Sequence, residues 1–235
     1  MRVASGSRTR CLRPPRYDDA VEPAPRADLS RTWALVPIRG LETAKTRLGE
    51  GLDAEERLEL VTDLLTRTLV ATRDAARIAG TVVVTMDPAA AGLARDHAAI
   101  GLVELAPGLN EAIEAARSVA LGRDATAIVV LPADLPAITP LAVDGLVEAA
   151  ALAGRGGDGV VAIVPDRHGS GTNALLVSPA ALVDPAFGPD SLARHRAAAA
   201  EAGATVVELD GPLSLDLDTT ADLIAAESEL GAFRG

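Results

Sequence analysis

Two acidic stretches contain the residues of a divalent-cation site. Asp134 lies in LPADLPAITP directly after the apolar run 127–130, and no other acid occurs within nine residues on either side. In LSLDLDTTADL, Asp216 and Asp218 alternate with leucines just before a predicted helix. Open α/β folds bind ligands where their strands end, and carboxylates at such a place suit a hard cation that carries phosphates. The two stretches therefore predict a cation site at the end of a sheet.

Each acid also has an ordinary structural alternative. A solvated turn residue, next to Pro136, is the alternative for Asp134. Asp218 has a competing role as the N-cap of the helix that follows it. Asp216 is therefore the preferred partner of Asp134.

Three cations lie in PIRGLETAKTRL (37–48), at the end of the first predicted strand: Arg39, Lys45 and Arg47. Together with Gly40 they indicate a phosphate-binding loop before a long helix. The spacing matches neither the P-loop nor the dinucleotide fingerprint. A solvated basic loop is the alternative.

Glycines and hydroxyls in DRHGSGTNALLVS (166–178) predict an anion-binding loop. Gly169 and Gly171 surround Ser170 and precede Thr172. Glycines let backbone N–H groups approach an anion, and hydroxyls add donors without charge. A flexible hairpin loop would explain the glycines, but not the gathering of cationic and hydroxyl side chains in a chain of net charge -11.

A second anion site is predicted in FGPDSLARH (187–195), where Gly188 leads into Ser191 at a helix start. The free N–H groups of a helix N-terminus attract anions. Helix capping by Asp190 or Ser191 is the alternative. His168 and His195, which lie in these two stretches, are better explained as anion contacts or structural residues than as bases.

The elements that must position these residues alternate between short β-branched runs and longer helical periods. This alternation predicts an α/β fold with a mostly parallel sheet. The strands are expected at 33–38, 80–85, 102–105, 127–131, 159–164, 173–177 and 205–208. The helices are expected at 54–72, 88–97, 109–120, 140–153, 191–202 and 219–230.

The composition predicts one domain preceded by an extension. Residues 31–235 have no linker, whereas residues 1–30 are rich in arginine and proline without an apolar run, which favours a disordered N-terminal extension. No run resembles a signal peptide or a membrane span. The one cysteine, Cys11, lies in the extension. A cytoplasmic location is therefore expected.

Charge and aromatic content exclude two classes of partner. The net charge is -11, which opposes binding to nucleic acid or to an anionic membrane. Aromatic residues make up 2% of the chain, so almost none are present for base stacking.

Taken together, these stretches resemble the guanylyltransferases of coenzyme F-420 biosynthesis, which act on 2-phospho-L-lactate or phosphoenolpyruvate. The resemblance covers nearly all of residues 32–230. It rests on AKTRL (44–48), LNEAI (109–113), ADLP (133–136), GSGTNAL (169–175), FGPDSLARH (187–195) and DLDTTADL (216–223). It implies a three-layer α/β/α sandwich similar to the GT-A nucleotidyltransferases. Arg39 and Ala133 depart from the family, which more often has Lys and Gly there.

The resemblance implies how the acceptor and the metal are held. Thr172, Gly188 and Ser191 would bind the phosphate and carboxylate of a phosphorylated three-carbon acid. Asp134 and Asp216 would bind magnesium.

It also implies the nucleotide contacts. Lys45, with Arg39 and Arg47, would meet the phosphates of GTP, and Asn110 would lie near the nucleoside. Lys45 and Asp134 are thereby the expected catalytic residues.

The implied reaction is transfer of GMP from GTP to the acceptor with release of pyrophosphate, followed by hand-off of an unstable product to the next enzyme of the pathway. Phosphoenolpyruvate is the preferred acceptor, because the Ala- and Arg-rich composition is typical of actinobacterial chains. 2-Phospho-L-lactate and 3-phosphoglycerate stay open, as does the oligomeric state. The alternatives are a nucleotidyltransferase of the same fold with another base or acceptor, and a nucleotide-binding protein without catalysis.

Overall fold

The computed structural model describes residues 26–42, 52–105, 108–219, 221–224 and 226. Its centre is a seven-stranded sheet in the order β3-β2-β1-β4-β6-β5-β7. The strands are β1 (Thr32–Pro37), β2 (Ile78–Thr85), β3 (Ile100–Val103), β4 (Ala127–Val130), β5 (Val160–Pro165), β6 (Thr172–Ser178) and β7 (Thr205–Glu208). The helices are α1 (Ala54–Asp74), α2 (Pro88–Asp96), α3 (Leu109–Leu121), α4 (Pro140–Ala153) and α5 (Ser191–Glu201), with 3-10 turns η2 (Gly154–Gly156) and η3 (Pro212–Ser214).

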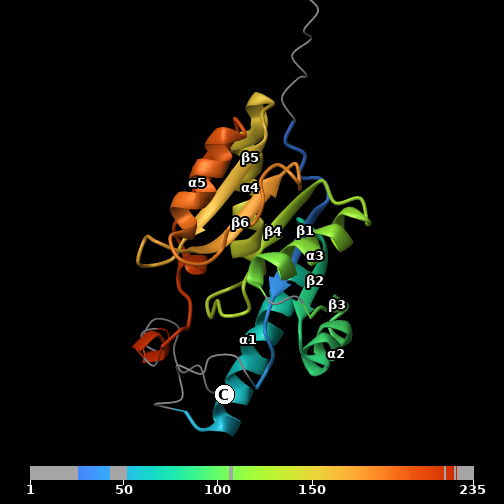
Figure 1. The fold of residues 1–235 in the computed structure, drawn as a ribbon, viewed down its shortest axis with the longest axis vertical. Coiled ribbons are helices and arrows are strands. Elements are labelled where there is room, and N and C mark those ends of the chain that lie inside the picture. The colour runs from blue at the N-terminus through green and yellow to red at the C-terminus, as the bar shows by residue number, and fades with distance from the viewer. Residues whose placement is uncertain (1–25, 43–51, 106–107, 220, 225, 227–235) are drawn as a thin grey trace, which may run out of the picture.

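The sheet is mixed because one strand is reversed. β6 runs antiparallel to both of its neighbours, β4 and β5, whereas the pairs β1–β2, β1–β4, β2–β3 and β5–β7 are parallel (Figure 1). The predicted mostly parallel sheet is confirmed. The reversal brings the first residues of β6 to the edge where the parallel strands end.

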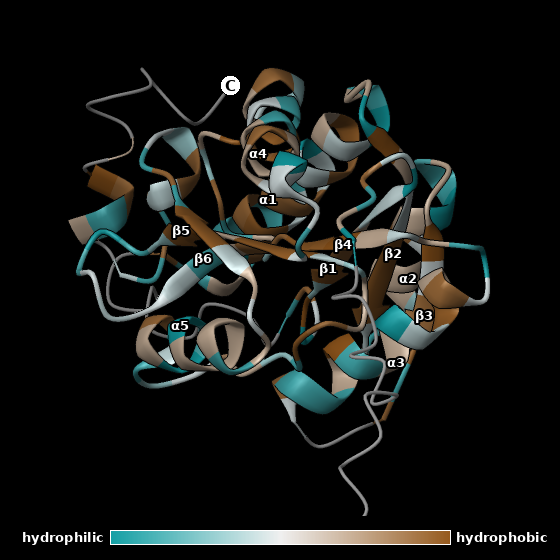
Figure 2. Cartoon of the chain, turned by 90° about the horizontal axis from the view of Figure 1, so that it is seen from above, coloured by the Kyte–Doolittle hydropathy of each residue, from teal (hydrophilic) through white to brown (hydrophobic). Residues whose placement is uncertain are grey.

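Helices cover both faces of the sheet, as the three-layer prediction requires. α1 and α4 lie on one face and α3 and α5 on the other, with the apolar strands between them (Figure 2). The α3 and α5 face buries, among others, Ile113, Leu192, Leu175 and Val177. The α4 face buries, among others, Val143, Leu146, Ala174 and Leu176. In keeping with the low aromatic content, the core consists mainly of aliphatic side chains.

Helix starts are fixed by local side-chain caps. Asp53 caps α1 by accepting from the N–H groups of Glu55 and Glu56, and Glu56 reciprocates as a capping box. α2 and α4 each begin at a proline that follows an N-cap, Asp87 or Thr139 respectively.

A β-bulge interrupts the start of β6. Val164 of β5 lies opposite Ala174, but Pro165 lies opposite Thr172, so Asn173 is an extra residue in the pairing. Strict alternation would give Thr172 the same face as Ala174, which packs toward α4. The shift instead turns Thr172 toward α5, where its hydroxyl contacts His195. β-Bulges commonly change the direction of a side chain in this way.

The elements follow the sequence prediction closely. All seven expected strands and the first five expected helices are present, with ends that differ by a few residues. β3 starts earlier than expected because Ile100 already pairs with Val82 of β2. Of the helix expected at 219–230, residues 219, 221–224 and 226 are described; 221–224 and 226 are helical, and Thr219 lies in a bend before them.

The expected extension, 1–30, is described from residue 26 onward, and residues 1–25 lie outside the described residues. Asp28 is attached to β6: its N–H donates to Ser178 Oγ, and that hydroxyl donates to the Asp28 carbonyl, each at 2.9 Å. Ala27 and Leu29 pack against the α4 side of the core. Across the described ranges, no helix has the length and apolarity to span a bilayer.

Candidate active site

Two of the predicted site residues, Arg39 and Asp134, lie at the carboxyl edge of the sheet, where the neighbouring strands β1 and β4 end. β2 and β3 lie on one side of β1 in the sheet, whereas β4 and the strands that follow it lie on the other side. Ligands of open α/β sheets bind at such a reversal of strand order. Arg39 follows β1 here, and Asp134 follows β4.

The loop after β1 is anchored to the end of β2. The Arg39 carbonyl accepts from the Met86 N–H and from Thr85 Oγ1, both at 3.3 Å. The Leu41 N–H donates to Asp87 Oδ2 at 3.0 Å. The Arg39 side chain is exposed at this edge. Lys45 and Arg47 lie outside the described residues, so their roles stay predictions.

The two predicted metal ligands lie on adjoining segments. The Leu217 N–H donates to the Asp134 carbonyl at 3.0 Å, which joins the Asp216 segment to the loop after β4. Asn173 Nδ2 donates to the Ser214 carbonyl at 2.9 Å and to Asp216 Oδ1 at 3.4 Å. Both acids are half-buried.

This donor set fits a small hard cation. No group of three or more His, Cys, Asp or Glu side chains suited to a metal occurs among the described residues. Nucleotidyl transfer commonly employs a divalent metal, and magnesium is often held by one or two carboxylates plus substrate phosphates. Asp134 and Asp216 supply carboxylates of that kind.

At the start of the last helix, Thr219 and Asp222 form a capping box, which favours Thr219 over Asp218 as its N-cap. Thr219 Oγ1 accepts from the Asp222 N–H at 3.3 Å, and Asp222 Oδ2 accepts from the Thr219 N–H at 2.6 Å. Buried Asp222 also accepts from the Asp218 N–H and pairs with Arg167. The preference for Asp216 now rests on its contact with Asn173 and on its lower exposure than Asp218.

The glycine-rich loop before β6 is stabilised by hydrogen bonds to Asp166 and contacts the start of α5. Asp166 Oδ1 accepts from the Ser170 N–H at 2.9 Å, and the Asp166 carbonyl accepts from the Gly169 N–H at 3.0 Å. The Ser170 carbonyl accepts from the Leu192 N–H at 3.2 Å. This contact joins the two predicted anion-binding stretches.

Thr172 and His195 form a buried pair between β6 and α5. Thr172 Oγ1 lies 3.0 Å from His195 Nδ1, and the Ala186 N–H donates to Nε2 at 3.0 Å. The Phe187 ring meets the imidazole edge to face, with centroids 4.9 Å apart. Burial, aided by the nearby Arg194 charge, lowers the pKa of His195 to about 4. The prediction that His195 is no base agrees with a ring that is 0% exposed and engaged at both nitrogens.

The start of α5 is not capped by a side chain, which removes the alternative explanation for this stretch. Asp190 occupies the N-cap position without a side-chain cap bond, and Ser191 is the first helical residue. Ser191 is 2% exposed. Gly188 has φ +116°, which favours glycine, and a Cβ there would lie 3.3 Å from Arg194 Nη2.

α3 holds the loop that leads to Gly188. Asn110 Nδ2 donates to the Phe187 carbonyl at 3.1 Å, and Asn110 Oδ1 accepts from the Phe187 N–H at 2.8 Å. Arg117, also on α3, donates to the Val183 carbonyl at 2.9 Å and to Asp184 Oδ1 at 2.8 Å. The predicted contact of Asn110 with the nucleoside stays a prediction.

Sequence reasoning missed Arg117 as a support of this loop. A signal for it was present, because Arg117 lies four residues after Ile113 on the apolar face of the helix. A cation at such a position needs a partner when it is buried.

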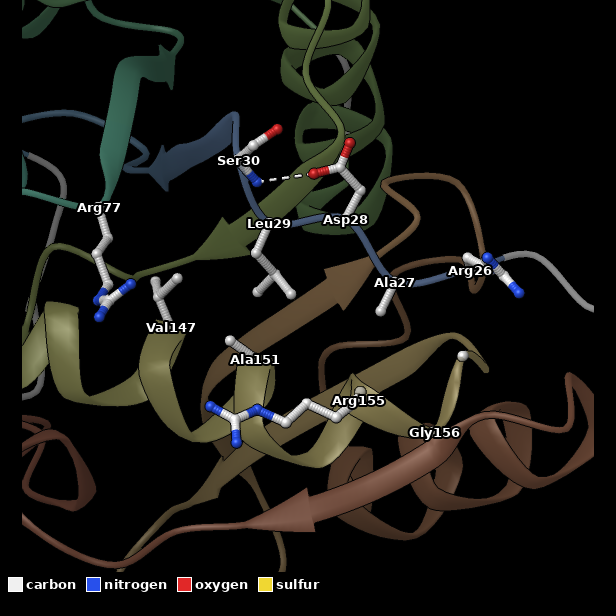
Figure 3. A pocket seen from close by; sticks show the side chains of 12 residues that line it. Arg26, Ala27, Asp28, Leu29, Ser30, Arg77, Val147, Ala151, Arg155 and Gly156 are labelled. Atoms are coloured by element: carbon white, nitrogen blue, oxygen red, sulfur yellow. Dashed lines mark hydrogen bonds between the residues drawn. The ribbon is translucent and has the colours of Figure 1, made fainter.

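A separate pocket of about 630 Å³ lies at the opposite edge of the sheet, where strands begin. It is lined by residues that precede β1, β2 and β5, among them Leu29, Arg77 and Arg155. Figure 3 shows this pocket, with Ser30 N–H donating to Asp28 Oδ1 at 2.9 Å on its rim. Its place at the amino ends of the strands separates it from the candidate site.

Solved structures share this fold. A 4-diphosphocytidyl-2C-methyl-D-erythritol synthase is 17% identical with a TM-score of 0.57, covering 86% of this chain and 100% of its own. A CMP:2-keto-3-deoxy-manno-octonic acid synthetase complexed with CTP is 13% identical with a TM-score of 0.54, covering 86% of this chain and 98% of its own. The α/β architecture is therefore that of nucleotidyltransferases, as predicted.

Sequence relatives agree over most of their length. A phosphoenolpyruvate guanylyltransferase of Sphaerobacter thermophilus is 41% identical over 204 residues, 86% of this chain and 96% of that protein. One of Conexibacter woesei is 38% identical over 208 residues, 87% of this chain and 91% of that protein. The family model "Guanylyl transferase CofC like" matches residues 32–227, a span that contains every site residue named above. The chain therefore belongs to the CofC-like guanylyltransferase family.

Proposed function

We propose that this chain transfers GMP from GTP to phosphoenolpyruvate and releases pyrophosphate, in the biosynthesis of coenzyme F-420. The observation that carries the proposal is the junction of the two predicted anion-binding stretches, through the hydrogen bond from the Leu192 N–H to the Ser170 carbonyl, at the sheet edge that also bears Asp134. The names of the relatives support phosphoenolpyruvate as the acceptor.

The acceptor side offers uncharged hydrogen-bond donors for a small, multiply charged anion. Ser191 begins a helix that has no side-chain cap, and the N-terminal dipole of this helix favours a phosphate or carboxylate. Gly188 leaves room for close approach because it has no side chain. Thr172 adds a hydroxyl from the start of β6. These three residues would hold the phosphate and carboxylate of the acceptor.

The proposed nucleotide site combines two acids near the sheet with the basic residues that follow β1 in the sequence. Asp134 and Asp216 would hold magnesium, which, when bound, offsets charge on the reacting phosphates. Arg39 lies exposed at the same edge. Lys45 and Arg47 would join it on the triphosphate, with Lys45 offsetting the charge that develops on pyrophosphate.

The chemistry requires no nucleophile from the protein. A phosphate oxygen of the acceptor attacks the α-phosphorus of GTP in line, and the bond from that phosphorus to the β-phosphate oxygen breaks. The acceptor phosphate is already ionised at neutral pH, so no base is needed. Positioning by Thr172, Gly188 and Ser191 supplies much of the rate.

Pyrophosphate release tests the proposal directly. The chain is incubated with magnesium, each of GTP, ATP and CTP, and each of phosphoenolpyruvate, 2-phospho-L-lactate and 3-phosphoglycerate. Release is expected with GTP and phosphoenolpyruvate. Release with another nucleotide or acceptor alone supports the related-transferase alternative. A GTP-induced rise in melting temperature without any release supports a binding protein.

Hand-off of the product can be tested in the same assay. If the product is unstable and passed on directly, adding the next enzyme of the pathway raises its recovery. Equal recovery when that enzyme is added late contradicts direct transfer.

A further inference from the structure

The imidazole of His195 is bound at both ring nitrogens, and the two partners differ in kind. The Ala186 N–H can only donate, so Nε2 at 3.0 Å must accept and carries no proton. A ring with a bare Nε2 is neutral and holds its single proton on Nδ1. The backbone of Ala186 therefore selects the tautomer.

The selected tautomer determines how the Thr172 hydroxyl is used. Nδ1 lies 3.0 Å from Thr172 Oγ1, so the Nδ1–H donates and the hydroxyl oxygen accepts. The proton of Thr172 is then directed away from His195. Thr172 is the first residue of β6, and the bulge that follows it holds it at the sheet edge.

The ring has little freedom to adopt another arrangement. His195 is 0% exposed, and Phe187 packs against it edge to face. The lowered pKa, about 4, agrees with a ring that stays neutral at physiological pH. A protonated ring would also place an Nε2–H against the Ala186 N–H.

We propose that His195 is a positioning residue for the acceptor: its Nδ1–H makes the Thr172 hydroxyl a donor toward the phosphorylated acid, and its Nε2 holds the Ala186 end of the loop to Gly188. This inference rests on the proposed function, in which Thr172 and Gly188 hold that acid. It assigns His195 a role in recognition through its neighbours, without contact to the reacting atoms.

Two substitutions separate the two bonds. Asn places an amide near the Nδ1 position and can still donate to Thr172, whereas Gln reaches the Nε2 position and can still accept from Ala186. Phosphoenolpyruvate is varied at saturating GTP for both variants. His195→Gln is expected to raise the acceptor KM about tenfold without changing the GTP KM, and His195→Asn to raise it less.

The dependence on Thr172 is tested with a double-mutant cycle. Thr172→Val removes the hydroxyl at nearly equal volume. In that background His195→Gln is expected to cause no further rise in acceptor KM, because the hydroxyl it orients is already gone. Independent, additive effects of the two changes would overturn the inference.

The tautomer itself has a readout that needs no catalysis. Long-range proton–nitrogen spectra show which ring nitrogen carries the proton, and the chain has three histidines, so the His195 signals are assigned by their loss in His195→Asn. A protonated Nδ1 is expected at neutral pH, and a protonated Nε2 would refute the inference. Absence of pyrophosphate release by the wild-type chain would instead refute the proposed function.

Discussion

The side-chain amide of Asn110 forms two hydrogen bonds with the backbone of Phe187: its oxygen accepts from the N–H at 2.8 Å, and its nitrogen donates to the carbonyl at 3.1 Å. An amide paired in this way acts like a neighbouring strand, because it completes the backbone hydrogen bonds of one loop residue. The residue sits in the first turn of α3, and Phe187 directly precedes Gly188. Asn110 thereby holds the loop before Gly188 against α3.

Asn110→Ala is expected to raise the acceptor KM several-fold, about tenfold at most, since the loop before Gly188 loses two hydrogen bonds. The GTP KM should stay near the wild-type value. Steady-state kinetics with each substrate varied in turn provide the measurement. A selective rise in the GTP KM would favour the nucleoside contact that the sequence resemblance implies.

Ser191→Ala is expected to raise the acceptor KM with little change in melting temperature, because Ser191 is the first helical residue and not the N-cap. Thr139→Ala is the matched control, since the Thr139 side chain does cap α4 through the Ala142 N–H at 3.1 Å. The control should lose about 1 kcal/mol of unfolding free energy and keep its acceptor KM. The same thermal loss in Ser191→Ala, at wild-type KM, would contradict its role in binding.

Asp134→Asn and Asp216→Asn should each lower metal-dependent turnover by about 100-fold or more, because an amide keeps the volume but not the charge that a hard cation needs. Asp218→Asn, two residues away and more exposed, serves as the control and should lose much less. Turnover is measured over a range of magnesium concentrations. The opposite ranking of Asp216 and Asp218 would move the ligand to Asp218.

Acidification should remove stability that His195 contributes. Its pKa is lowered to about 4 in the folded chain from 6.5, so the unfolded chain binds the proton more readily. The contribution is complete above about pH 6.5 and is lost as the pH falls toward about 4, a change on the order of 3 kcal/mol. Urea unfolding of wild type and His195→Asn at several pH values tests this, since their difference should shrink on acidification. A constant difference would contradict it.

A chain that begins at Ser30 is expected to melt at a lower temperature than one that begins at Arg26. The shorter chain lacks both Asp28 bonds to Ser178 and the packing of Ala27 and Leu29. Removal of residues 1–25 alone should leave turnover intact. Equal melting temperatures would show that the Asp28 contacts contribute little.

Much of the fold is readable from the sequence because its strands are continuous apolar runs. β4 and β5 are buried on both faces, so each appears as an uninterrupted stretch between polar segments. The reversal of β6 is not readable in this way, since its direction depends on pairs such as Ile128 with Val177, far apart in the chain.

The same contrast holds for the site. Thr172 and Ser191 can be recognised from the sequence as candidate anion-binding residues, because Thr172 follows Gly171 and Ser191 stands at a predicted helix start. The contact of Asn110 with Phe187 joins residues 77 apart in sequence, and residue type alone does not reveal it. The cap at Thr219 was readable, since Thr and Asp three residues apart form a capping-box pattern.

The bulge in β6 changes what a one-residue deletion would do there. In a regular strand, losing a residue turns every side chain beyond it to the opposite face. Because Asn173 is the surplus residue, its loss would restore plain alternation and leave Thr172 facing α5 and Ala174 facing α4. The chain could therefore shorten here, in evolution or by design, and keep the Thr172 hydroxyl beside His195 while giving up the amide that reaches Asp216.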